Sequence, residues 1–291
     1  MYTRLIYIVL VILTPFFTKA QQLPYNLSEQ KALQLPDTLR EISGITMISK
    51  EFIACVQDEN GILFIYDLSK NKIHKQILFA PNGDYEELAK AGKTIYVLRS
   101  DGTIFEIKNY DDKKRSVSSY TTEITASNNE GLCYDEPNNR LLVGCKNKAE
   151  KGPLYKNKRF IYSFDLETKH MLEKPAFVFN MDSIKHFITQ HNITIPLNSK
   201  KKHHGSESVL KFRISAICIH PITGQLYVLS AVDYLLMVFN RNGSIETLAL
   251  LDPKIFNKAE GITFSENGDM LISNEGQKGK PTLLRFNYLL K

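Results

Sequence analysis

Glutamate recurs at regular intervals in this chain, inside a short phrase that also ends in an aliphatic residue. Glu86, Glu130 and Glu260 occupy the same place in three copies of the phrase, and Ser43 and Ser215 occupy it in the other two. Carboxylates that converge repel one another, so they require a cation, a basic partner or a shared proton. The five copies are Ser43-Gly44-Ile45, Glu86-Glu87-Leu88, Glu130-Gly131-Leu132, Ser215-Ala216-Ile217 and Glu260-Gly261-Ile262.

Each copy of the phrase opens an apolar strand, and a second apolar strand about a dozen residues later ends in polar residues. The start of the first arm of a hairpin and the end of the second lie on the same side, because the strands are antiparallel. The sequence therefore predicts a site where these strand ends meet. Its expected residues are Ser43, Gln57, Asp58, Glu86, Arg99, Glu130, Lys146, Arg213, Ser215, Ser230, Glu260, Asn274 and Glu275.

Two kinds of chemistry suit this set. A hard cation such as Ca²⁺ or Mg²⁺ takes carboxylate and amide oxygens, with Glu86, Glu130 and Glu260 as the candidate ligands. In the alternative, basic side chains neutralise the carboxylates in a ring of ion pairs. The oxygens that would complete a metal site come from Asp58, Asn274 and Glu275, and the basic side chains of the alternative are Arg99, Lys146 and Arg213.

The sequence does not favour a nucleophilic serine or a zinc site. It has no Gly-x-Ser-x-Gly elbow, and His220 falls in a hairpin turn on the opposite face from Ser215. His203 and His204 stand in a polar loop without the Cys and His spacing of a zinc site. We therefore expect no Ser-His triad.

The repeat predicts the fold. The central positions 44, 87, 131, 216 and 261 are 43, 44, 85 and 45 residues apart, and a unit of this length with four strands is typical of a propeller blade. We expect an all-β protein, a single β-propeller with five four-stranded blades; a sixth blade inside the double gap is the alternative. Residues 181–212 lack strand-like runs and predict a polar insertion with a short helix capped by Asp182. The last copy lacks one strand, which residues 31–35 can supply, so the N-terminal strand would close the ring.

The first twenty residues predict a cleaved signal peptide, which leaves residues 21–291 as the propeller domain. Arg4 precedes an apolar run at residues 5–17 that is short for a bilayer span, and cleavage after Ala20 fits the small residues there. We expect an exported protein of the periplasm or cell surface. An uncleaved anchor at residues 5–17 is the alternative, and only then would the chain contact a membrane.

The net charge and the cysteines limit the partners and the disulfide bonds that we expect. The formal net charge is +6 over 291 residues, and removal of Arg4 and Lys19 leaves +4. The basic residues do not concentrate on one element, so we expect no nucleic-acid partner. All four cysteines lie inside apolar runs and are interpreted as small buried hydrophobes. One disulfide is the alternative, with Cys133 and Cys145 the nearest pair because they fall on two arms of one hairpin. The cysteines are Cys55, Cys133, Cys145 and Cys218.

Several phrases resemble the SdiA-regulated (YjiK-like) family over about residues 38–288. The phrases are Asp84-Tyr85-Glu86-Glu87-Leu88-Ala89, Asn129-Glu130-Gly131-Leu132 with Lys146, Ile219-His220-Pro221-Ile222-Thr223-Gly224 with Leu226-Tyr227-Val228-Leu229-Ser230, Ala259-Glu260-Gly261-Ile262, and Ile272-Ser273-Asn274-Glu275-Gly276. The resemblance implies a β-propeller of the bacterial cell envelope whose biochemical function is not established. It also implies an analogy to propellers of the calcium-dependent esterase and phytase type.

Three functions are compatible with these observations. The first is a binding module, expected to be monomeric, that holds a small ligand, a cation or an envelope protein at the polar mouth of its central channel. The second is a metal-dependent esterase or phosphoesterase, in which a channel cation activates water. The third is a structural scaffold whose channel charges only neutralise one another.

Overall fold

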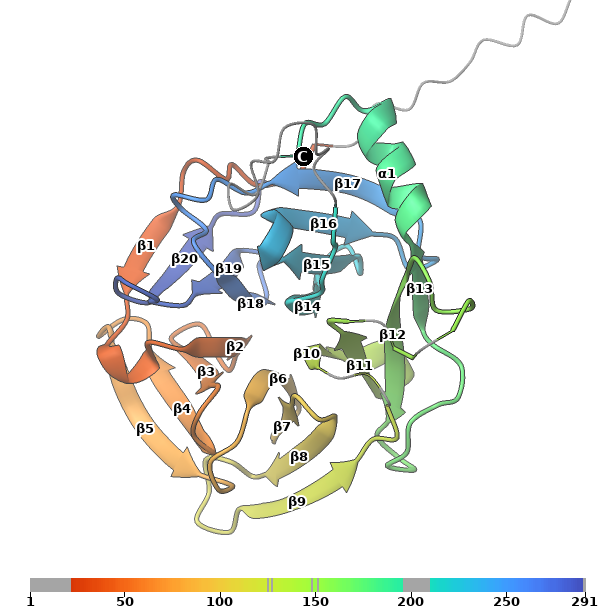
Figure 1. Ribbon diagram of the computed structural model, residues 1–291. Helices are drawn as coiled ribbons and strands as arrows, with labels where there is room; N and C mark the ends of the chain where they lie inside the picture. Colours follow the sequence, from red (N-terminus) through yellow and green to blue (C-terminus); the bar gives the residue numbers. More distant parts are fainter. Residues whose placement is uncertain are drawn as a thin grey trace, which may run out of the picture.

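The computed structural model describes residues 22–124, 126, 128–147, 149–150, 152–195 and 210–289. These residues form five four-stranded antiparallel sheets arranged in a ring around a central axis (Figure 1). The prediction of an all-β propeller with five blades is confirmed. The region expected to be a signal peptide lies outside the described residues, and none of the helices described is both long and apolar enough to cross a bilayer.

Each blade runs from an innermost strand at the channel to an outermost strand at the rim. Blade 1 consists of β2 (Ile42–Met47), β3 (Phe52–Gln57), β4 (Ile62–Asp67) and β5 (Lys72–Leu78). Blade 2 consists of β6 (Tyr85–Ala91), β7 (Thr94–Arg99), β8 (Thr103–Lys108) and β9 (Ser116–Thr121). Blade 3 consists of β10 (Asn129–Asp135), β11 (Arg140–Cys145), β12 (Lys158–Asp165) and β13 (Phe177–Asn180). Blade 4 consists of β14 (Ala216–Ile219), β15 (Leu226–Ser230), β16 (Leu235–Phe239) and β17 (Ile245–Leu250). Blade 5 contains β18 (Ala259–Phe264), β19 (Met270–Asn274) and β20 (Thr282–Phe286).

The N-terminal strand completes blade 5. β1 (Lys31–Gln34) pairs antiparallel with β20, with Ala32 opposite Leu284. The Leu35 amide then donates to the Pro281 carbonyl at 2.8 Å, and the Leu35 side chain is buried against Leu283 and its neighbours. The predicted closure of the ring by the N-terminal strand is confirmed.

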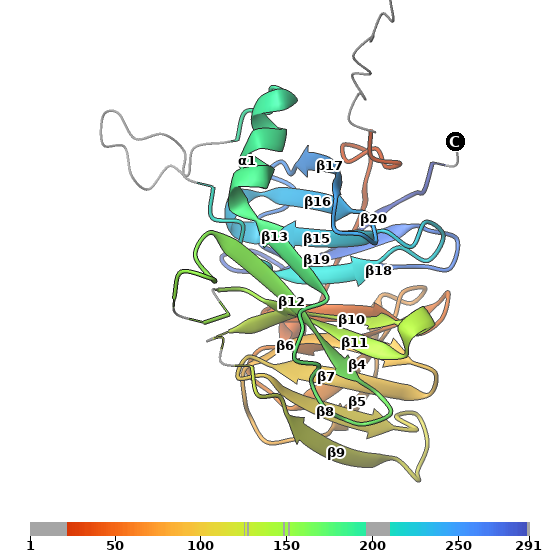
Figure 2. The same cartoon turned by 90° about the vertical axis from the view of Figure 1, so that its right-hand side faces the viewer.

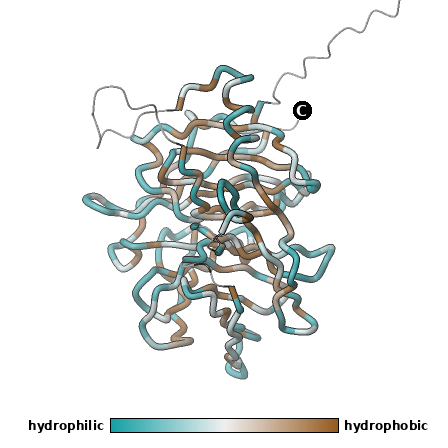
Figure 3. The backbone as a smooth tube through the Cα atoms, turned by 45° about the vertical axis from the view of Figure 1, so that its right-hand side comes forward, coloured by the Kyte–Doolittle hydropathy of each residue, from teal (hydrophilic) through white to brown (hydrophobic). Residues whose placement is uncertain are grey.

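The apolar core is divided among the five seams between neighbouring blades, where side chains from two adjoining sheets pack together. The middle strands are buried nearly throughout, whereas β5 and β9 alternate or face water. Figure 3 shows the same distribution, with apolar strands inside and hydrophilic turns around them. The fourth strand of a blade lies at the rim and contacts water, so it can carry polar residues.

The insertion begins with α1 (Met181–Gln190), which lies outside the ring beside blades 3 and 4 (Figure 2). The expectation that Asp182 caps this helix is wrong. The Asn180 side chain is the cap, because its Oδ1 accepts from the Asp182 amide at 2.8 Å, which places Asp182 inside the first turn. Ile184 is buried in the seam between blades 3 and 4. The polar run at residues 200–206 lies outside the described residues.

The four cysteines are free thiols, three of them buried and Cys218 partly so. In the hairpin of β10 and β11, Cys133 is opposite Leu142 and Cys145 is opposite Asn129. Cys133 packs in the seam with blade 4, whereas Cys145 packs in a separate small cluster. The two side chains therefore serve different parts of the core, as expected for small hydrophobes.

Candidate functional site at the channel mouth

A β-bulge sets the position of each repeated glutamate. In β6 the pairing passes from Tyr85 opposite Arg99 to Glu87 opposite Leu98, so Glu86 is the extra, unpaired residue. The same shift skips Glu130 at the start of β10 and Glu260 at the start of β18. A bulge redirects a side chain out of the regular alternation of a strand. The three glutamates are thus structurally equivalent, as the repeat predicts.

The residue after each bulge lies where the innermost strands approach closely. A Cβ added at Gly261 would lie 2.6 Å from the Ser43 carbonyl oxygen, and one at Gly44 would lie 2.5 Å from Glu87 Cα. Glycine at these positions removes the atom that would collide. The sequence phrase therefore encodes both a redirected side chain and the close approach of neighbouring blades.

Glu87 stands in β6 where the other copies have glycine or alanine, and sequence reasoning did not single it out. Its carboxylate lies against Gly44, is 1% exposed, and accepts from the amides of Ile45 and Leu88, both at 3.1 Å through Oε1. Burial raises the pKa of Glu87 well above its usual range. The departure from the glycine pattern was the available sequence signal for this buried acid.

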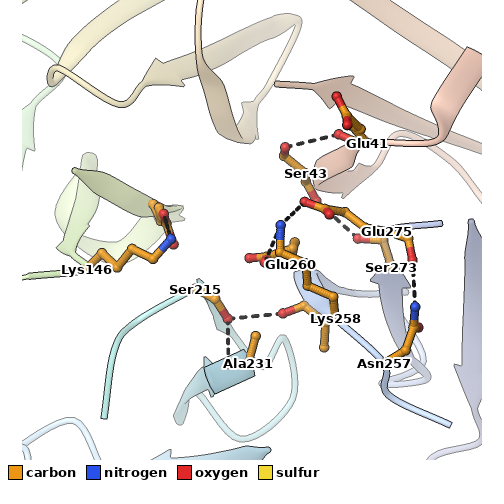
Figure 4. A network of polar contacts seen from close by, with 12 residues as sticks. Glu41, Ser43, Lys146, Ser215, Ala231, Asn257, Lys258, Glu260, Ser273 and Glu275 are labelled. Atoms are coloured by element: carbon orange, nitrogen blue, oxygen red, sulfur yellow. Dashed lines mark hydrogen bonds and ion pairs between the residues drawn. The ribbon is translucent and has the colours of Figure 1, made fainter. Parts of the chain in front are cut away.

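Two lysines pair with the mouth carboxylates. Lys146 Nζ forms an ion pair with Glu130 Oε1. Lys258 Nζ lies 3.3 Å from Glu260 Oε1 and also pairs with Glu275 (Figure 4). Lys258 was missed in the sequence, although its place two residues before a repeated glutamate is a signal that could have identified it. These pairs support the ion-pair interpretation for Lys146.

The two predicted arginines do not neutralise the carboxylates. Arg99 forms an ion pair at 2.7 Å with Asp101 and lies over the Phe105 ring, because the turn after β7 folds its acidic residue back onto the strand end. Arg213 is exposed and has no carboxylate partner among the residues that the structure describes. Its backbone amide donates to Ser230 Oγ at 3.1 Å.

The other predicted site residues divide between the mouth and the scaffold. Ser215 Oγ donates to the Ala259 carbonyl at 3.1 Å, which ties blade 4 to blade 5. Ser230 Oγ donates to Asp233 Oδ2 at 2.8 Å. Gln57 and Asn274 are buried, and Gln57 accepts from the Glu59 amide in the turn after β3, whereas Asn274 donates to the Ile255 carbonyl in the segment before β18 and to Thr282 Oγ1. Ser43 Oγ donates weakly, at 3.4 Å, to the Glu41 carbonyl, so these groups orient the site more than they offer free donors.

Burial and mutual repulsion raise the pKa of several mouth carboxyl groups. Burial, followed by the charges of Glu130 and Asp84, raises the pKa of Glu86 to about 9. Burial raises the pKa of Glu130 to about 7, although Lys146 opposes the shift. Burial and the Glu41 charge raise the pKa of Asp58 to about 7, and burial also raises the pKa of Glu260. The mouth therefore carries less negative charge than its number of carboxyl groups implies.

The metal hypothesis gains no geometric support from the part of the chain that the structure describes, which contains no group of three or more His, Cys, Asp or Glu side chains placed to hold a metal ion. Glu86, Glu130 and Glu260 influence one another's pKa but are not gathered at ligand distance around one point. The assignment of these three residues to Ca²⁺ or Mg²⁺ stays a prediction.

A cavity of about 510 Å³ opens at the mouth beside these ion pairs. Cationic side chains dominate its wall: Lys146, Lys211, Arg213 and Lys258 line it together with a single carboxylate, that of Glu260. Figure 4 shows Lys146 and Glu260 extending from different blades toward the same central space. Ser215, Tyr234, Asn257 and Gln277 add polar groups to the wall.

Farther along the channel a ring of aliphatic side chains contributes to the wall. A second cavity, of about 300 Å³, is lined by the aliphatic residue of each repeated phrase and by Cys133 and Cys218. Charged and polar side chains, including Lys90, Glu136 and Arg241, line the same cavity, so its aliphatic ring is bordered by polar groups. The aliphatic residues are Ile45, Leu88, Leu132, Ile217 and Ile262.

Comparison with known proteins identifies solved structures of similar fold and a family whose pattern matches the chain. A glutaminyl cyclase of Myxococcus xanthus matches 88% of this chain and 94% of its own at a TM-score of 0.56 and 12% identity. A streptogramin B lyase matches 89% of this chain and 98% of its own at a TM-score of 0.49 and 11% identity. At these identities the likeness concerns the fold alone, and no curated protein matches the sequence. The pattern of the SdiA-regulated family matches residues 20–278, and the chain therefore belongs to the SdiA-regulated family.

Proposed function

We propose that this protein is exported and binds a small anionic molecule, bearing a carboxylate or phosphate, in the cavity at its channel mouth. The observation that carries the proposal is the excess of cationic over anionic side chains around one cavity, four against one. Two of the four, Lys146 and Lys258, already pair with carboxylates. Lys211 and Arg213 have no such partner in the described part of the chain and supply the free positive charge.

The segment that carries these two cations is held in place before any ligand arrives. Asp233 accepts from the amides of Lys211 and Phe212, the latter at 2.7 Å. Arg159 donates to the carbonyls of the same two residues, to Phe212 at 2.7 Å. With Phe212 fully buried between two exposed neighbours, the side chains of Lys211 and Arg213 are displayed from a fixed backbone. Such preorganisation lowers the entropy lost on binding.

The chemistry of the wall suits a carboxylate or phosphate. Guanidinium groups bind both through paired N–H donors, and lysine adds a compact charge. A cavity of this size lies within the range of sites for small ligands, about 300–1,000 Å³. Ser215 and Asn257 provide neutral polar groups for the rest of such a molecule.

The test is isothermal titration calorimetry of the purified protein with inorganic phosphate and with acetate, on the native chain and two variants. Arg213→Gln should weaken binding about tenfold or more, the effect of losing one charge-assisted contact. Lys50→Gln, which removes an exposed positive charge from the turn between β2 and β3 on the other face, should leave binding unchanged. Absence of binding of both anions, or equal binding by Arg213→Gln, would contradict the proposal.

Export has its own test, because the mouth geometry does not depend on it. When the full chain is expressed in a bacterium, we expect mature protein in the envelope or medium with Gln21 as its first residue, by intact mass. Retention of residues 1–20 in a membrane fraction would favour the anchor alternative.

A further inference from the structure

The free cations of the mouth cavity and most of its neutral polar groups come from different blades. Contacts between innermost strands run from β2 to β6, β10, β14, β18 and back to β2, so blades 3, 4 and 5 are consecutive and blade 4 is opposite blades 1 and 2 (Figure 1). Lys211 and Arg213 come just before β14 of blade 4. Blade 5 supplies Asn257 just before β18, Glu260 within it, and Gln277 after β19. A ligand held by the cations of blade 4 would therefore meet amide and carboxylate groups of blade 5.

Two side-chain amides in the blade 5 wall are exposed and have unused hydrogen-bonding capacity. Asn257 Nδ2 donates to the Glu275 carbonyl at 2.9 Å, which orients the amide and leaves Oδ1 without a donor among the described residues. The Gln277 side chain forms no hydrogen bond in the same part of the chain. Arg40 Nη1 holds the Gln277 backbone in place by donating to the carbonyls of Gln277 at 3.2 Å and Gly279 at 2.7 Å.

Glu260 is the single carboxylate in this cationic wall. It is 8% exposed, and its Oε1 lies 3.3 Å from Lys258 Nζ. A carboxylate repels a bound anion, so the part of the ligand beside it must offer hydrogen-bond donors instead of further negative charge. An ammonium group would supply donors but would also approach the positive charges of Lys146 and Lys258. Hydroxyl groups donate without either penalty.

Tyr234 adds an aromatic ring to the same wall. It ends the short helical turn Ala231–Asp233 with a left-handed φ of 52°, and its carbonyl accepts from the Leu251 amide at 2.8 Å. The side chain is only partly buried. An aromatic ring fixed in this way offers an apolar surface to the C–H face of a ring-shaped ligand.

We propose that the anion bound at the mouth is a hydroxylated one, of the sugar acid or sugar phosphate type. The inference rests on the proposed anion site and specifies the rest of the same molecule. The anionic group lies on Lys211 and Arg213, and the hydroxyl groups bond to Asn257, Glu260 and Gln277. A hydroxyl both donates and accepts, which suits a wall of carbonyl, carboxylate and amide groups. An alkyl group in the same place would remove these groups from water without replacing their hydrogen bonds.

The experiment is isothermal titration calorimetry with two pairs of probes that differ in their hydroxyl groups. Glucose 6-phosphate is compared with cyclohexylmethyl phosphate, and glucuronate with cyclohexanecarboxylate, so each pair keeps the anionic group and a six-membered ring. We expect the hydroxylated member to bind at least about tenfold more tightly, the effect of about two net hydrogen bonds. The pair with the larger preference identifies phosphate or carboxylate as the anionic group.

Variants locate the hydroxyl groups. Gln277→Ala and Asn257→Ala should each reduce the preference about threefold or more, while the affinity for cyclohexylmethyl phosphate stays unchanged and shows that the site is intact. Gln76→Ala removes an exposed amide from the rim strand β5 and should retain the full preference. A full preference in both Gln277→Ala and Asn257→Ala would overturn the placement of the hydroxyl groups on blade 5.

The outcomes separate the two proposals. Equal affinity for the two members of both pairs would overturn the sugar and leave the anion site intact. No binding of any of the four probes would overturn the anion site and the sugar with it. Glucose that binds as tightly as glucose 6-phosphate would overturn the role of Lys211 and Arg213 as the anchor of the ligand.

Discussion

Glu86 should make the folded protein less stable as the pH rises from mildly acidic to mildly basic. Its pKa is about 9 in the folded state against 4.5 for the free side chain. The folded chain therefore holds a proton that the unfolded chain releases above pH 4.5, so the free energy of unfolding falls as the pH increases. The contribution is complete below pH 4.5 and is lost progressively up to about pH 9.

The size of the change in the free energy of unfolding follows from the pH range over which the folded chain retains the proton. Between pH 5.5 and 8.0 the retained proton corresponds to about 3 kcal/mol, at 1.36 kcal/mol for each pH unit. Glu86 is partly exposed, and solvent screening reduces the effect to about 2 kcal/mol. Carboxyl groups with a lowered pKa, such as Asp101 and Glu106 at about 2, are ionised in both states throughout this window. His220, with a pKa lowered by burial to about 4, acts in the opposite direction below pH 6.5 but equally in a Glu86 variant.

The assay is urea unfolding followed by far-ultraviolet circular dichroism, since the chain has no tryptophan. Glu86→Gln and the native chain are compared at pH 5.5 and pH 8.0. The variant should gain about 2 kcal/mol relative to the native chain between these two conditions, while Glu51→Gln should gain nothing. Parallel pH profiles for Glu86→Gln and the native chain would refute the argument that burial and like charge hold Glu86 protonated.

Two further predictions concern the scaffold. Gly261→Ala should destabilise the fold by about 1–3 kcal/mol in urea unfolding, because its Cβ would lie 2.6 Å from the Ser43 carbonyl oxygen; Gly279→Ala, with no neighbour nearer than 3.6 Å, is the control, and equal stability of the two variants would contradict the close approach of blades 5 and 1. Leu35→Ala should lose about 2–4 kcal/mol, because this 3% exposed side chain packs the ring closure. A loss below about 1 kcal/mol would show that β1 does not hold the ring together.

Periodicity explains why the fold was predictable from the sequence. Strands alternate or run apolar, turns carry Asn-Gly or Asp-Gly, and the phrase around Glu86, Glu130 and Glu260 returns at blade-length intervals. These are local patterns whose physical meaning does not depend on distant residues. The missing strand of the last copy even indicated the closure by β1, because a ring with an unpaired edge is unfavourable.

The helix cap and the partners of individual side chains were harder to predict from the sequence. From the sequence we expected Asp182 to cap the helix, whereas the backbone path out of β13 places Asn180 at the N-cap. Arg99 was expected among the carboxylates, but its own turn supplied Asp101. Glu87 was overlooked because its partner Ile45 lies in the neighbouring blade and it departs from the glycine of the repeat, and Lys258 was overlooked because it lies outside the repeated phrase although it pairs with Glu260 and Glu275 of its own blade. Such choices depend on the exact backbone path at the strand and helix ends, which periodicity does not specify.

The sequence by itself favoured five blades over six and indicated the closure and the equivalent places of the three repeated glutamates, because each follows from a short-range pattern repeated along the chain. Only the tertiary structure decided how charge is distributed around the mouth. Lys211 and Arg213 belong to a segment without a counterpart in the other blades, and the ring brings them opposite Asp58 and Glu86, more than a hundred residues away. Electrostatic interaction depends on distance in space and on burial, and neither can be read from sequence separation.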